Sequence, residues 1–276
     1  ELYPARNDER IYDWPSYPPV IETDETAEAV RAEYFALMTM CDRSLGRVLD
    51  FMDEHDMWDD TMLIVNTDHG FLLGEHGWWG KSVMPWFDET IHTPLFLWDP
   101  RVKAKDARRS SLVATIDIAP TLLDFFGVEP TPDMQGRPLQ QVVADDTPVR
   151  ESTLFGVHGS HVSITDGRYV YMRASATDEN QPLYEYTLMP THMRSRFFVE
   201  ELRDIELSEP FDFTKEVPLM RIPTGPAGSP AAFGTLLYDL VEDPDQKSPL
   251  RDPELELRMA ELLVAQMRET DAPVEQ

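Results

Sequence analysis

The first third of the chain carries one long run of helical periodicity. Between about Glu25 and His55, apolar residues recur at three- and four-residue spacing and form a single stripe. Asp24, directly before this run, is a plausible N-cap. Cys41 lies on the stripe, so we expect it on the buried face of the helix, where it would behave as a small apolar residue.

Two short apolar runs and a second helix follow. Residues 62–65 and 94–98 are apolar without alternation, which is typical of strands buried on both faces of a parallel sheet. Asp117 can cap a helix that has Pro120 in its first turn and ends before Gly127. The order strand, loop, strand, helix predicts a layered α/β domain.

The pattern changes after about residue 150, where β-hairpin signals appear. Residues 162–165 and 168–173 flank Asp166-Gly167, a dipeptide that favours a tight hairpin turn. Residues 236–240 predict one more strand. Asp252, followed by a proline, predicts the start of a final amphipathic helix.

Two segments show no clear period. Residues 1–22 are rich in proline, tyrosine and charge and predict an extended segment on the surface. Residues 177–233 are interpreted as a long surface excursion. We therefore predict an α/β chain in two parts. Residues 1–150 would form the layered domain, and residues 151–276 a small antiparallel-sheet domain with a terminal helix.

Charge and composition exclude several classes of function. The chain has 24 basic and 51 acidic residues, a formal net charge of −27, which disfavours binding to nucleic acid or to anionic lipid. We also expect no membrane span, because no apolar run is long enough. A single cysteine rules out an intrachain disulfide framework and slightly favours the cytoplasm, although the compartment stays open. Any anionic substrate would need a locally positive site.

Asp68 and His69 are the strongest candidates for such a site. They directly follow a predicted buried strand, where ligands commonly bind in open α/β sheets. A carboxylate and an imidazole can both bind one divalent cation, and Gly70 permits the sharp turn that lets both side chains face it. Lys81, a short loop later, could supply positive charge for an anionic substrate.

Five further residues are weaker candidates. His76 could contact a leaving group or could only shape its loop. Trp78 and Trp79 could form a wall for a sugar or aryl group or could simply pack the loop. His92 is expected near the sheet edge as a possible substrate contact, and His158 could reach the pocket from the second domain.

The order of these residues resembles a known family. Residues 63–81, Leu-Ile-Val-Asn-Thr-Asp-His-Gly-Phe-Leu-Leu-Gly-Glu-His-Gly-Trp-Trp-Gly-Lys, resemble a signature of the sulfatases, within the alkaline phosphatase superfamily, and of their iduronate-sulfatase branch. Residues 117–124, 165–171 and 237–244 resemble later parts of the same family. The resemblance implies that residues 1–150 are the C-terminal half of an alkaline-phosphatase-like catalytic domain. It also implies that Asp68 and His69 bind a divalent cation, with calcium preferred over magnesium or manganese. Lys81 would hold an ester oxygen, and the substrate would be a small sulfate ester or a sulfated sugar.

The family's nucleophile motif has no counterpart in this sequence. Sulfatases carry Cys-x-Pro-x-Arg or Ser-x-Pro-x-Arg, whose first residue becomes formylglycine, and neither pattern occurs here. The family's early Asp-Asp metal pair is also missing. We therefore expect formylglycine to lie on an N-terminal part of the same enzyme, outside this chain, and we expect the chain to be stable only with that part. A phosphonate or phosphate ester hydrolase, or a non-catalytic anion-binding module, remains an alternative.

Overall fold

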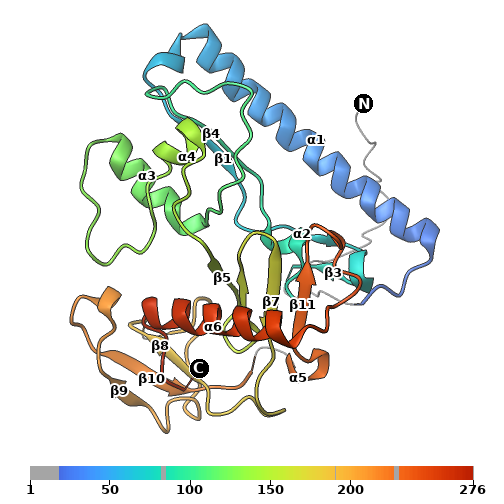
Figure 1. The fold of residues 1–276 in the computed structure, drawn as a ribbon, viewed down its shortest axis with the longest axis vertical. Coiled ribbons are helices and arrows are strands. Elements are labelled where there is room, and N and C mark those ends of the chain that lie inside the picture. Colours follow the sequence, from blue (N-terminus) through green and yellow to red (C-terminus); the bar gives the residue numbers. More distant parts are fainter. Residues whose placement is uncertain (1–18, 82–84, 190, 227–229, 276) are drawn as a thin grey trace. The chain divides into compact units, whose positions relative to one another are not determined.

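The computed structural model describes residues 19–81, 85–189, 191–226 and 230–275 (Figure 1). Most of the predicted entry segment, residues 1–18, lies outside the described residues. Contacts divide the chain into two compact units. The first holds residues 1–83 and 87–108, and the second holds residues 84–86 and 109–276. The domain boundary predicted at residue 150 stays a prediction.

The first unit begins with the long helix α1, Asp24–Glu54 (Figure 1). The predicted helix is confirmed, but its N-cap is Thr23, not Asp24. The expected burial of Cys41 is wrong, because its side chain is exposed. Leu37, on the same stripe, is 60% exposed. The reason is that Trp79 packs only against the first turns of α1. Among the described residues of this unit, the apolar side chains in the middle of the helix therefore stay exposed to solvent.

Strands β1, Leu63–Asn66, and β4, Leu95–Trp98, form a two-stranded sheet. Both predicted strands are confirmed. Their predicted parallel sheet is wrong, because they pair antiparallel, with Leu63 opposite Trp98. An unbroken apolar run indicates burial but carries no information on strand direction. The expected two-sided burial also fails at Phe96, which is 68% exposed.

A short hairpin and a short helix follow β1 in the first unit. Strands β2, Leu72–Leu73, and β3, Trp79–Gly80, pair antiparallel around the 3-10 turn η2, Glu75–Gly77. Arg31 on α1 donates from Nε to the Leu73 carbonyl at 2.7 Å and so ties the hairpin to the long helix. The short helix α2, Asp88–Ile91, lies just before β4. Together these elements hold the candidate site described below.

The second unit begins with short helices around a buried carboxylate. These elements are η3, Thr115–Asp117; α3, Ile118–Phe125; and α4, Gln140–Asp145. Asp117 is 0% exposed and stands at the start of α3 as predicted. Its carboxylate caps no amide of α3. It accepts from the backbone amides of Ala114 and Arg137, each at 2.8 Å, and pairs with Arg150.

A four-stranded antiparallel sheet forms the core of the second unit. Its strands are, in spatial order, β11, Leu236–Asp239; β7, Tyr169–Arg173; β6, Val162–Thr165; and β5, Thr153–Gly156. Helix α6, Pro253–Glu269, covers it through Met259 and Leu263, which pack against Ile164 and Tyr171 (Figure 1). The predicted hairpin, strand and capped final helix are confirmed, with Asp252 accepting from two amides of the first turn.

The interpretation of residues 177–233 as an excursion without regular structure is wrong. The segment holds a three-stranded antiparallel sheet, with β10, Leu219–Pro223, between β8, Tyr184–Thr187, and β9, Glu206–Ser208. It also holds η4, Asp212–Thr214, and α5, Pro230–Phe233. The strands are short and paired over long loops, so no local period marks them. None of the helices among the described residues has the length and apolarity to cross a membrane.

Candidate functional site

The first unit brings together three of the residues predicted from sequence. Asp68 and His69 follow the end of β1, and Lys81 follows β3. The Lys81 ammonium donates from Nζ to Nε2 of His69 at 2.5 Å. An oxygen of Asp68 lies 3.5 Å from the same nitrogen. The Asp68 side chain is 83% exposed, so its carboxylate is open to a ligand. We call these three residues the corner.

Hydrogen bonds define which nitrogen of His69 carries the proton. Nδ1 lies 2.8 Å from the carbonyl oxygen of Gly70, which can only accept, so Nδ1 holds the hydrogen. The lone pair therefore sits on Nε2, which faces Asp68 and Lys81. The hydroxyl of Thr67 donates to the His69 carbonyl at 3.2 Å and restrains the backbone.

The local charges keep the Asp68 carboxylate ionised. Desolvation by burial acts to raise its pKa, but electrostatic interaction with the His69 ring, backbone hydrogen bonds and the charge of Lys81 outweigh it, and the pKa is lowered on balance. An ionised carboxylate next to an imidazole lone pair fits a divalent cation chemically. Two such ligands are only part of a coordination shell. The described residues contain no group of three or more His, Cys, Asp or Glu placed to hold an ion.

Gly70 joins the corner to the backbone of α2. Its amide donates to the Thr90 carbonyl at 2.9 Å. A Cβ atom at Gly70 would lie 1.8 Å from the Glu89 carbonyl oxygen, which is far inside contact distance. The close approach therefore requires glycine here for a steric reason, whereas the sharp turn expected at Gly70 stays a prediction.

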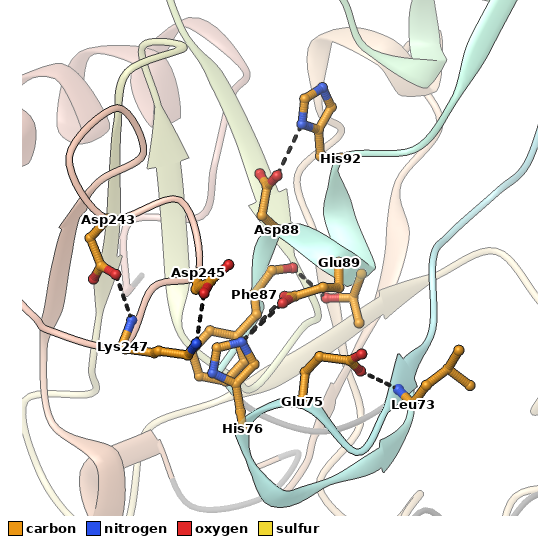
Figure 2. A network of polar contacts seen from close by, with 11 residues as sticks. Leu73, Glu75, His76, Phe87, Asp88, Glu89, His92, Asp243, Asp245 and Lys247 are labelled. Atoms are coloured by element: carbon orange, nitrogen blue, oxygen red, sulfur yellow. Dashed lines mark hydrogen bonds and ion pairs between the residues drawn. The ribbon is translucent and has the colours of Figure 1, made fainter. Parts of the chain in front are cut away.

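His76 lies in a covered position beside the same helix (Figure 2). Its Nε2 is 3.3 Å from both carboxylate oxygens of Glu89, and its ring stacks on Phe87 with centroids 3.5 Å apart. The His76 side chain is 10% exposed. Its predicted contact with a leaving group stays a prediction. Sequence reasoning missed Glu89 and Phe87, because no local signal links them to a histidine in a separate loop.

The two tryptophans differ in their surroundings. Trp79 is 0% exposed, packs with Ala27 and Val30, and donates from its indole nitrogen to Glu22 at 2.8 Å. Its predicted role as a substrate wall is therefore corrected to the packing alternative, since no surface is left for a ligand. Trp78 is half-buried and pairs with Pro19 in an isolated bridge, so its substrate role stays a prediction.

His92 and His158 were the remaining candidates. His92 ends α2, and its Nδ1 lies 3.0 Å from a carboxylate oxygen of Asp88 (Figure 2). His158, in the second unit, has Nε2 2.8 Å from the Tyr184 carbonyl. The structure describes the two units separately, so a contribution of His158 to the corner stays a prediction, as does substrate contact by His92.

The His92 pair gives a testable pH dependence. The hydrogen bond from His92 to Asp88 raises the pKa of His92, against the opposing effect of burial, and the Asp88 charge raises it further. A raised pKa means that the pair stabilises the fold fully below the pKa of an unfolded histidine, and that this contribution is lost as pH rises through the folded value. Asp88→Asn should therefore lower the pKa of His92 in an NMR titration. An unchanged pKa of His92 would contradict the pairing.

Several known proteins resemble this chain. Residues 9–128 match the sulfatase family, and residues 74–208 match the C-terminal domain of N-sulphoglucosamine sulphohydrolase. An N-acetylglucosamine-6-O-sulfatase of Bacteroides thetaiotaomicron is 34% identical over 41% of this chain and 20% of its own length. A multifunctional alkaline phosphatase superfamily protein of Trinickia caryophylli is 34% identical over 43% of this chain and 23% of its own.

A solved structure supports the fold assignment. It is described as a complex with its substrate D-glucosamine-2-N,6-O-disulfate, and it covers 87% of this chain and 40% of the solved chain at a TM-score of 0.59 and 20% identity. The predicted α/β fold class is thus confirmed. The matches reach less than half the length of these relatives, and the finer likeness to the iduronate-sulfatase branch stays a prediction. Between them the two family models match residues 9–208, and over this stretch the chain is similar to the sulfatases, within the alkaline phosphatase superfamily.

Proposed function

We propose that this chain supplies part of the metal and anion site of an enzyme that hydrolyses sulfate esters. The observation that carries the proposal is the corner, where an exposed carboxylate, an imidazole lone pair and an ammonium meet in a chain that is similar to the sulfatases. These are the groups that an acidic protein with a net charge of −27 needs in order to accept a sulfate ester.

In this proposal, two residues of the corner bind the cation and the third binds the ester. Asp68 and His69 would hold a divalent cation, for which the resemblance to sulfatases favours calcium; oxygen ligands suit calcium, magnesium and manganese alike. When bound, the cation supplies Lewis-acid stabilisation of charge on the transferring group. The His69 lone pair now accepts from Lys81. With that lone pair holding a cation, the Lys81 ammonium would be left to bind an anionic ester oxygen.

The proposed enzyme also needs a nucleophile, which another part of the enzyme would supply. The sequence holds no Cys-x-Pro-x-Arg or Ser-x-Pro-x-Arg, so we infer that a formylglycine and the other metal ligands come from an N-terminal part of the same enzyme. The modest share of the relatives' length that this chain matches supports that inference.

Sulfated sugars are the substrate class that we favour. The N-acetylglucosamine-6-O-sulfatase and the structure solved with a sulfated glucosamine both match this chain, which supports that class. The second candidate is hydrolysis of phosphonate or phosphate esters. It is favoured by the similarity to the relative named as a multifunctional superfamily protein.

Turnover of paired substrates tests the proposal. The enzyme that contains this chain should hydrolyse p-nitrophenyl sulfate faster than p-nitrophenyl phenylphosphonate. A chelator should abolish turnover, and added calcium should restore it. Faster cleavage of the phosphonate would favour the second candidate. If the protein binds sulfate but hydrolyses neither ester, both hydrolase proposals fail and a non-catalytic anion-binding module takes their place.

A further inference from the structure

The backbone of helix α2 contacts Gly70, the residue that directly follows the corner residue His69. The Gly70 amide donates to the Thr90 carbonyl at 2.9 Å, and Gly70 approaches the Glu89 carbonyl so closely that no Cβ fits between them. Gly70 directly follows His69, and its own carbonyl accepts from Nδ1 of that ring. A shift of α2 would therefore move the acceptor that defines the His69 tautomer.

The side chain of His76, in the loop that contains η2, also contacts this helix. His76 lies 3.3 Å from both oxygens of the Glu89 carboxylate, and its ring is nearly parallel to that of Phe87, at 4° (Figure 2). Thus Glu89 contacts Gly70, next to the corner, with its backbone and His76 with its side chain. With only four residues, α2 has little intrinsic stability and depends on such contacts.

The backbone of His76 lies in a conformation that is uncommon for residues other than glycine. Its φ is 55°, in the left-handed region that glycine or asparagine adopts more easily than histidine. The two contacts of the ring, with Glu89 and Phe87, offset the strain.

We propose that His76 is a positioning residue for the corner. Acting through Glu89 and Phe87, it holds α2 in place, and α2 in turn holds Gly70 and the orientation of His69. This inference matters for catalysis only if the proposed function is correct, and in that sense it rests on the proposed function. Its physical content, the restraint of Gly70 by His76, can be measured without metal or substrate.

Amide exchange at Gly70, measured by NMR on the enzyme that contains this chain, without metal, tests the proposal. His76→Asn removes the ring but keeps a residue that tolerates a positive φ. We expect the Gly70 amide to exchange at least about tenfold faster in this variant, while amides of β6 and β7 in the second unit keep their rates. His55→Asn, at the exposed end of α1, is the matched control and should leave Gly70 unchanged.

Variants of Glu89 make the result specific. Glu89→Ala should accelerate Gly70 exchange as His76→Asn does, and the double variant should add little, because both act through one contact. Glu89→Gln retains an oxygen that accepts from His76 and should preserve most of the protection. Unchanged Gly70 exchange in both single variants would overturn the proposal. So would an equal loss of protection throughout the first unit, which would indicate a general structural role.

A second measurement separates this inference from the proposed function. Addition of Mn²⁺ should broaden the ring signals of His69 in the unaltered chain. If Mn²⁺ leaves them sharp, the metal-site proposal fails, whereas the Gly70 exchange data still decide the role of His76. If Mn²⁺ broadens them equally in His76→Asn with unaltered Gly70 exchange, the metal site stands and the positioning role fails.

Discussion

Lys81→Ala is expected to lower kcat/KM for a sulfate ester by about 10²- to 10³-fold, the usual effect of removing one placed donor from a developing negative charge. The physical reason is the field of the whole protein. With a net charge of −27, this chain repels an anionic ester except near its local cations. The Lys81 ammonium stands 2.5 Å from the nitrogen proposed to bind the cation, so it can reach an oxygen of an ester bound there.

A matched lysine in the same unit provides the control. Lys103 is exposed and pairs with Asp59 at 2.6 Å, and Lys103→Ala should leave kcat/KM unchanged. Lys81→Arg keeps the charge but changes its geometry, and should recover only part of the loss. Calcium affinity, measured by calorimetry, should not fall in Lys81→Ala, because Lys81 competes with the cation for the His69 lone pair. A loss of less than about threefold in kcat/KM would remove Lys81 from the proposed anion site.

Local signals in the sequence predicted those elements whose causes are local. The Asp166-Gly167 turn and the Asp252 cap each involve neighbouring residues, and both are present in the structure. The sheet of β8, β10 and β9 was missed because each strand is short and pairs across a long loop. The stripe around Cys41 predicted a helix correctly, but periodicity cannot say what covers a face.

The same distinction holds for the candidate site. Asp68, His69 and Lys81 belong to one short motif, so their proximity was predictable from sequence order and confirmed in the geometry. Their roles in binding metal and substrate stay predictions. Glu89 and Phe87 were not predictable, since their contacts with His76 depend on how α2 folds back onto the loop. The motif thus predicts the groups of the candidate site, whereas the contacts around them, such as those of Glu89 and Phe87 with His76, emerge only in three dimensions.

Asp117 provides the largest expected effect on stability. Its carboxylate is 0% exposed, accepts from two backbone amides and pairs with both terminal nitrogens of Arg150, which is itself largely buried. Asp117→Asn removes the charge and turns an NH₂ group toward these donors. Arg150 is then left without its counter-charge in a site that excludes water. Breaking a buried pair in this way typically costs about 3–5 kcal/mol of unfolding free energy.

Urea denaturation of the enzyme that contains this chain, followed by circular dichroism, measures the loss. For typical denaturant slopes, we expect Asp117→Asn to lower the midpoint of the transition that includes the second unit by about 1–3 M. The double variant Asp117→Leu with Arg150→Met should regain much of the stability, because an apolar pair leaves no charge buried. If Asp117→Asn and the double variant lower the midpoint equally, the loss reflects the amides of Ala114 and Arg137, not the stranded guanidinium. That comparison therefore separates the ion pair from the hydrogen bonds that hold the turn before α3.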